Sequence, residues 1–233
     1  MHFIRCVLAE CALVRPRLLR TRFGPCLLSL GATLVWLGTR GADSATVALH
    51  AGALGSVVGA AFVAGSAADR AALAITLAHP TTPLAVACGR WLAAVIPAAG
   101  LTVACTVAVG WHPGAALAGL AAAAAVAGCA LAAVLVAGTG AGLVLFLFMV
   151  VVGTVPPETL VGVADPGAAR LAVASALELG PALWRYREVA GAGDVDTVGA
   201  LLHAAAWALL GVVLASGVVR RRARAPCRRR PRD

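Results

Sequence analysis

The chain has 233 residues, of which 61% are hydrophobic and 12% are charged, and its formal net charge at pH 7 is +9. Soluble globular proteins contain about 25% charged residues, and the mean hydropathy of this chain is +0.92. The composition therefore excludes a soluble globular protein. It predicts one all-α integral membrane domain over residues 1–233, with no room for a sizeable soluble domain.

All nineteen basic residues are arginine and none is lysine. A Walker A loop needs its lysine to reach the phosphates of a bound nucleotide. The chain cannot carry that motif, so ATP-driven work would require another subunit. Neither an H-E-x-x-H metal site nor a G-x-S-x-G nucleophile elbow is present. We therefore expect no catalytic residue, no cofactor and no metal, and we predict that the chain is not an enzyme.

Residues 1–22 form a basic segment whose apolar residues recur at helical spacing. This pattern predicts an amphipathic helix that lies in the cytoplasmic interface of the membrane. Its apolar face consists of Phe3, Val7, Cys11, Val14 and Leu18. Arg5, Glu10 and Arg17 fall elsewhere on the helix, and Pro16 is expected to break or kink it. The alternative is a basic leader that only orients the first span.

Apolar runs between charged residues predict six transmembrane helices. They are residues 23–39, 47–68, 91–110, 115–137, 143–155 and 197–219. The fifth is short of the usual 20 or so residues and has to extend in one direction or the other. The glycine-rich residues 138–142 before it are expected to form a tight turn. In the second span, Gly52, Gly55, Ser56 and Gly59 form a small-residue packing face.

The arginines are distributed unevenly between the two sides of these spans. Fifteen lie in residues 1–22, 69–90 and 220–233, and four lie in the connections on the other side. Because cytoplasmic loops carry the excess of basic residues, both termini are expected to face the cytoplasm across the cell inner (plasma) membrane. The basic tail, 220–233, is expected to contact anionic lipid headgroups rather than nucleic acid.

The longest segment on the other side is 156–196, which is too apolar in its middle to be a free loop. We expect it to be a helical insertion between spans five and six, resting at the outer interface with Trp184 and Tyr186 at headgroup level. Glu158 and Glu178 could form an acid/base pair or a cation site. Solvated charges beside the membrane surface are the favoured interpretation.

His50 and His203 are predicted near the outer ends of their spans. Ionisable residues inside spans are candidates for function because their burial is costly. The two histidines could line a substrate path or ligate haem or a metal. The simpler interpretation is a neutral ring satisfied by water or by a backbone carbonyl.

The connection between spans two and three, 69–90, carries a recognisable order of residues. These are Asp69, Arg70, Leu73, Thr76, Leu77, Pro80, Gly89 and Arg90. Leu73 and Leu77 lie at positions i and i+4 of a short helix and form an apolar ridge that a partner's groove could bury. Pro80 ends that helix, because the residue before a proline is displaced from helical geometry. The alternative is a surface loop that returns the chain to the bilayer.

This order resembles the membrane permeases of ABC-2 type transporters, in which a charged pair, a Thr-Leu run, a proline and a Gly-basic pair follow one another. Here these elements are Asp69-Arg70, Thr76-Leu77, Pro80 and Gly89-Arg90. An N-terminal interfacial helix, six spans and an outer insertion are similar too, so the resemblance covers nearly the whole chain. A haem-exporter-like permease belongs to the same broad class and stays open.

The resemblance implies that Asp69 to about Ala78 forms a coupling helix that docks on a separate cytoplasmic ATP-binding subunit. It also implies that two permease subunits, in a homodimer or with a second permease, form the substrate path, and an exporter is favoured over an importer. The rival from another class is a non-transport anchoring or assembly factor that recruits a cytoplasmic partner. A secondary transporter is disfavoured, because we find neither inverted repeats nor ionisable residues at mid-span.

Overall fold

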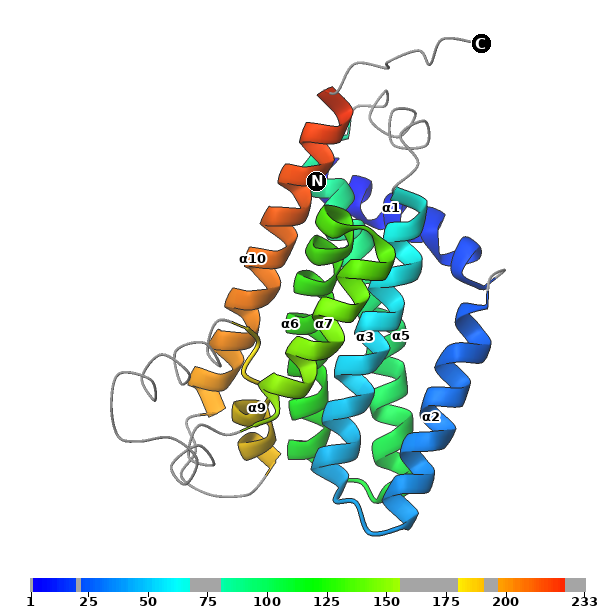
Figure 1. The fold of residues 1–233 in the computed structure, drawn as a ribbon, viewed down its shortest axis with the longest axis vertical. Helices are drawn as coiled ribbons and strands as arrows, with labels where there is room; N and C mark the ends of the chain where they lie inside the picture. Colours follow the sequence, from blue (N-terminus) through cyan, green and yellow to red (C-terminus); the bar gives the residue numbers. More distant parts are fainter. Residues whose placement is uncertain (1, 20–21, 68–80, 156–179, 191–196, 225–233) are drawn as a thin grey trace.

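The structure is a computed structural model that describes residues 2–19, 22–67, 81–155, 180–190 and 197–224 (Figure 1). Within these ranges the chain forms eight helices and no strand. The helices are α1 (His2–Leu19), α2 (Phe23–Thr39), α3 (Ser44–Ala67), α5 (Pro83–Val109), α6 (Pro113–Ala137), α7 (Thr139–Gly153), α9 (Leu183–Ala190) and α10 (Thr197–Arg224).

Helices α3, α5, α6 and α10 are long and apolar enough to cross a membrane. They contain 24, 27, 25 and 28 residues, and at about 1.5 Å per residue each exceeds a hydrocarbon thickness of about 30 Å. Helices α2 and α7 are also apolar but have only 17 and 15 residues. The prediction of an all-helical chain is confirmed for the part that the structure describes, and its four long apolar helices are consistent with a membrane protein.

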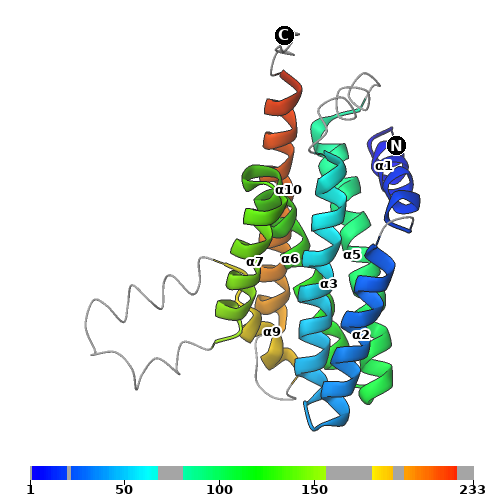
Figure 2. The same ribbon diagram turned by 45° about the vertical axis from the view of Figure 1, so that its right-hand side comes forward.

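The long helices run side by side along the long axis of the molecule (Figure 1, Figure 2). Helix α1 lies across one end, which we call the upper end, and α10 finishes at the same end. The turns from α2 to α3 and from α5 to α6 lie at the opposite, lower end, as does α9. Helix α1 continues past Pro16 to Leu19, so the proline does not break the helix, which was one of the two effects expected of it.

Helix α6 forms the centre of the bundle. It packs against α3, α5, α7, α9 and α10, and most of its buried side chains are alanines. Because alanine fills little space, neighbouring backbones must approach closely to pack against it. At one such contact, Trp91 of α5 donates its indole N–H to the Ala124 carbonyl of α6 at 3.0 Å.

Glycines bring α6 into backbone contact with two of these neighbours. A Cβ added at Gly52 of α3 would clash with the Gly119 backbone of α6. A Cβ added at Gly211 of α10 would clash in the same way with the Gly128 backbone of α6. One turn after Gly52, the buried hydroxyl of Ser56 donates to an α6 carbonyl at 2.9 Å. The small-residue face predicted in the second span is therefore confirmed as a packing face.

Helix α5 begins at Pro83, eight residues before the start predicted for the third span. The Thr82 side chain caps it by accepting a hydrogen bond from the Ala85 N–H at 3.2 Å, and Pro83 suits the first turn, where no helical donor is lost. The predicted connection of 69–90 therefore ends at residue 82 instead. Gly89 and Arg90 are buried in the bundle.

The fifth span also differs from its prediction, because the turn expected over residues 138–142 consists of one residue in the structure, Gly138. Gly138 has φ +85°, a conformation that glycine adopts without a Cβ penalty, and it reverses the chain between α6 and α7. Helix α7 therefore covers Thr139–Gly153, so the span expected at 143–155 extends backward, one of the two directions expected, and ends two residues earlier. Gly142 lies inside α7, where an added Cβ would meet the Val134 backbone of α6 at 2.7 Å.

One added methyl group at Gly52 should force α3 and α6 apart. We expect Gly52→Ala to lower the free energy of unfolding in detergent by about 1–3 kcal/mol, as overpacking usually does. Gly100→Ala of α5 is the matched control, because a Cβ there meets nothing within 4 Å. Reversible unfolding followed by circular dichroism measures both variants. Equal stabilities would contradict a tight contact between α3 and α6.

Candidate functional site

The residues predicted to couple to an ATPase lie outside the described part of the chain. They are Asp69, Arg70, Leu73, Thr76, Leu77 and Pro80, all within 68–80. The elements on either side of this segment are described. Helix α3 ends at Ala67 and α5 begins at Pro83, both at the upper end of the bundle (Figure 2). The segment is therefore attached to the bundle at the end where α1 lies.

Close to this attachment point, Glu10 of α1 and Arg90 of α5 form a buried ion pair. The Arg90 Nε donates to Glu10 Oε1 at 2.9 Å, and the two side chains are only 4% and 8% exposed. The Arg90 Nη1 is also buried and has no hydrogen-bond partner among the described residues. Each charge in such a pair gives up its hydration, so removing either partner leaves the other buried without compensation.

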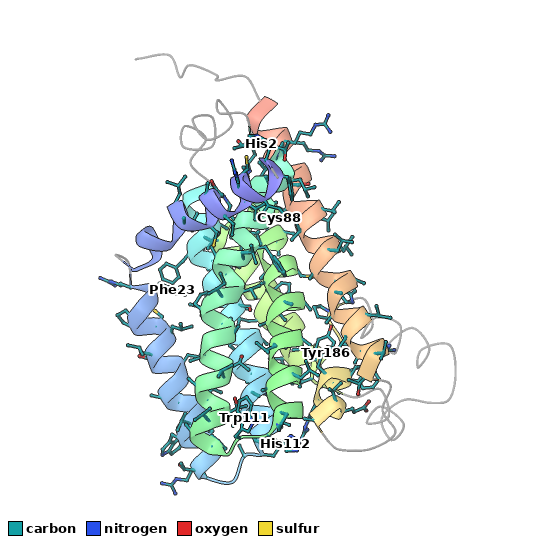
Figure 3. The ribbon with its side chains drawn as sticks, turned by 180° about the vertical axis from the view of Figure 1, so that it is seen from behind. His2, Phe23, Cys88, Trp111, His112 and Tyr186 are labelled. Carbon is teal, nitrogen blue, oxygen red and sulfur yellow. The ribbon has the colours of Figure 1, made fainter. Side chains whose placement is uncertain are left out.

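Gly89 allows α1 to come close enough for this ion pair. A Cβ at position 89 would lie 2.7 Å from the Glu10 Cβ and 2.8 Å from the Val7 carbonyl oxygen. Both distances are shorter than real contacts, so a larger residue would push α1 away from α5. Cys88, the preceding residue, lies beneath α1 near the upper end (Figure 3). Gly89-Arg90 therefore forms the docking point of α1, whereas the sequence suggested only the end of a loop.

The sequence pattern placed Glu10 away from the apolar face of α1, and the structure corrects this. Residues 7, 10 and 14 are three and four positions apart, so they lie on one side of a helix. Val7, Glu10 and Val14 are all buried there. Ile4 and Leu8 are 61% and 58% exposed. The spacing of Glu10 from Val7 and Val14 is visible in the sequence and could have indicated that Glu10 lies on the buried face.

The ion pair ties α1 to the first turns of α5. Arg90 follows Pro83 by seven residues, which places it about 10 Å along the helix from the point where the chain enters α5. A helix transmits displacement as a rigid element. A displacement of segment 68–80 would therefore be transmitted along α5 and reach α1 through the Glu10–Arg90 ion pair.

His203 of α10 belongs to a hydrogen-bonded cluster with Tyr186 and Trp207. Its Nδ1 is 2.9 Å from the Tyr186 hydroxyl, and its Nε2 is 3.0 Å from the Trp207 indole nitrogen. Because an indole N–H only donates, Nε2 accepts and the neutral ring carries its hydrogen on Nδ1. Burial raises the pKa of the Tyr186 phenol, so this hydroxyl stays neutral at pH 7. The cluster joins α9 to α10 in the lower half of the bundle (Figure 3).

His50 is half-buried in α3, where its Nδ1 lies 2.7 Å from the Thr46 carbonyl of the same helix. His50 and His203 each lie six residues after the first residue of their helix, or about 9 Å from its start. No hydrogen bond joins the two histidines in the described structure. A substrate that contacted His203 would have to displace its bond to Tyr186 or to Trp207.

The lower end also carries a polar cavity of about 530 Å³, lined in part by Asp43, His112, Trp184, Arg187 and Glu188. Arg187 of α9 pairs with Asp43 at 3.3 Å, with both side chains about half exposed. Partial burial alone would raise the pKa of the Asp43 carboxyl, but hydrogen bonds from Thr46 and the Arg187 guanidinium hold that pKa below its ordinary value. Among the described residues, no three metal-ligating side chains form a cluster. Glu158 and Glu178 lie outside those residues.

Removal of one partner of the Glu10–Arg90 pair should destabilise the chain more than removal of both. Glu10→Leu leaves the Arg90 charge buried and unpaired, at a cost of about 3–5 kcal/mol. Glu10→Leu/Arg90→Leu buries no charge and should recover most of that loss. The control is Arg187→Gln, which breaks an exposed ion pair and should cost at most about 1 kcal/mol. Detergent unfolding measures all three, and a double variant that is no more stable than Glu10→Leu would contradict the coupling.

Comparison with protein-family models, with curated proteins and with solved structures finds no match for this chain. Its function is therefore argued from its own residues. The features available for that argument are an apolar helical bundle and a buried ion pair beside segment 68–80. The Tyr186–His203–Trp207 cluster is a second polar feature, inside the lower half of the bundle.

Proposed function

We propose that the chain is the membrane-spanning permease subunit of an ABC-type exporter. A second permease subunit completes the substrate path, and a separate cytoplasmic ATP-binding subunit hydrolyses ATP. The chain itself carries no catalytic role. It provides one wall of the path and receives movement from the ATPase through residues 69–78, whose order resembles the ABC-2 type permeases.

The observation that carries this proposal is the attachment of α1 to the first turns of α5 by the Glu10–Arg90 pair. A segment that only returned the chain to the bilayer would need no such attachment beside it. A docking segment that transmits force needs such an attachment between helices, because the force must reach more than one helix. The Gly89 contact and the ion pair make α1 and α5 respond together at this end.

The proposal includes α2 and α7 as two further spans, six in all. Helix α2 has 17 residues between Arg22 and Arg40, which is the lower limit for a span. Leu28 and Trp36 are 75% and 55% exposed, as side chains that face lipid are. The Arg40 guanidinium lies over the Trp36 ring at 5.3 Å, an arrangement suited to the headgroup region. Helix α7 is only about 22 Å long, so the bilayer thins beside it.

The upper end faces the cytoplasm in this proposal. The arginines at the end of α10 (Arg220, Arg221, Arg222 and Arg224) and those of α1 lie at the upper end, whereas Arg40, Arg185 and Arg187 lie at the lower end. Excess arginine marks the cytoplasmic side of a membrane protein. The upper end also carries the attachment of segment 68–80, where a cytoplasmic ATPase would have to bind.

Cysteine labelling of intact cells tests this orientation. In a chain whose native cysteines are replaced by alanine, Trp111→Cys at the lower end (Figure 3) should react with a membrane-impermeant maleimide. Thr139→Cys, at the start of α7, should react only after the cells are opened. Both native positions are exposed, so accessibility is matched. The reverse pattern would overturn the orientation, and labelling of both in intact cells would overturn the assignment of α6, the helix between them, as a span.

Co-purification with a candidate ATP-binding subunit tests the coupling. We expect the wild-type chain to retain the subunit and to stimulate its ATPase activity. Leu73→Asp/Leu77→Asp should weaken binding at least tenfold, because central apolar anchors of an interface are typically worth about 2 kcal/mol or more. Loss of binding together with loss of stimulation is the expected result.

The charge-matched control is Ala71→Asp/Ala78→Asp. On a helix these two positions fall at least about 100° from both leucines of the ridge, so this variant should bind as the wild type does. Equal binding by the wild type and the leucine variant would contradict the coupling role of the ridge. A wild-type chain that retains a cytoplasmic protein without ATPase activity, through the same leucines, would favour the anchoring alternative instead.

A further inference from the structure

An apolar groove runs along the bundle between α6, α7 and α10, with a volume of about 520 Å³. Most of its lining comes from α10, with Phe146 of α7 and Cys129 and Val136 of α6 opposite. Its volume is in the range of binding sites for small ligands, about 300–1,000 Å³. Gly217 keeps the groove open, because a Cβ at that position meets nothing within 4 Å.

One charged residue, Arg221, lines the groove at its upper end. The lining positions 207, 211, 214, 218 and 221 follow one another at intervals of three and four residues, so Arg221 lies on the same face of α10 as the apolar walls. Its side chain is exposed and forms no hydrogen bond or ion pair within the described part of the chain. The adjacent Arg222 is used differently, because its guanidinium donates to the Leu135 carbonyl at the end of α6.

We propose that this groove binds an anionic phospholipid, with an acyl chain between α7 and α10 and the phosphate on Arg221. From Trp207 to Arg221 the groove follows fourteen residues of α10, about 21 Å. One leaflet of the hydrocarbon core is about 15 Å thick. The groove therefore accommodates the acyl chain of a lipid whose headgroup lies at the level of Arg221. Basic pockets between membrane helices bind anionic headgroups in this way.

Charge argues for a lipid rather than for a second copy of this chain. A two-fold axis along the membrane normal would place the same surface of both copies face to face. Arg221 of one copy would then approach Arg221 of the other, and both chains carry Arg220, Arg222 and Arg224 beside it. Arginines brought face to face in this way repel one another, whereas a negatively charged phosphate is complementary to these arginines. The inference is independent of the ATPase proposal, because it requires only that the bundle lies in a membrane.

Native mass spectrometry of the full chain in mild detergent tests the site, with phosphatidylglycerol and phosphatidylcholine added at equal concentrations. The wild type should retain one phosphatidylglycerol in preference to phosphatidylcholine. Arg221→Gln should reduce that preference about fivefold, the effect of one basic residue on an anionic lipid. Arg220→Gln is the matched control, since position 220 lies about 100° around α10 from Arg221 and does not line the groove, so the preference should remain.

Gly217→Leu fills the groove with a side chain that the structure has room for, and it should abolish retention of both lipids. Size-exclusion chromatography confirms that each variant is folded and monodisperse. Equal losses for Arg221→Gln and Arg220→Gln would show a diffuse charge effect and overturn the site. Unchanged lipid retention by Gly217→Leu would also overturn it. Dissociation of a wild-type dimer by Gly217→Leu, without any change in bound lipid, would identify the groove as a subunit interface instead.

Discussion

The fold depends on backbone-level contact between α6 and its neighbours. In a bilayer the lipid tails are as apolar as the side chains, so helices associate through close packing and not through removal of apolar surface from water. Gly52 against Gly119 and Gly128 against Gly211 provide two such contacts, on opposite sides of α6. Helices α3, α6 and α10 therefore form a core with little freedom to slide. Any functional movement has to involve the elements attached around this core.

Helix α1 is attached in a different way. Its contact with α5 combines one glycine and one buried ion pair. A buried pair contributes little to stability compared with apolar residues of the same size, because both charges lose their hydration. It does impose a single arrangement, since a shift of α1 by one residue would separate the charges. The Glu10–Arg90 pair is thus better suited to fixing the position of α1 than to holding the bundle together.

The membrane character and the helices themselves follow from composition and apolar runs, and they could be predicted. The start of α5 was missed because local turn chemistry outweighed the apolar pattern, since Thr82 caps the helix. The start of α7 was left between two directions of extension, and Gly138 alone, which reverses the chain, fixes it. The packing face of α3 was visible as small residues at helical spacing. The Glu10–Arg90 pair could not be derived, because residues 80 positions apart are paired only by the tertiary fold. Tyr186, the partner of His203 on α9, was hidden for the same reason.

Arginines near a membrane interface are usually counted as one class, and here the structure separates them by role. Arg90 is neutralised inside the protein by Glu10, so it offers no charge to the membrane. Arg222 donates to a carbonyl in the last turn of α6, where such carbonyls lack helical partners. Arg221 remains available at the surface. Removing Arg90 from the sequence count still leaves fourteen arginines against four, so the orientation argument does not rest on the residue that the fold uses internally.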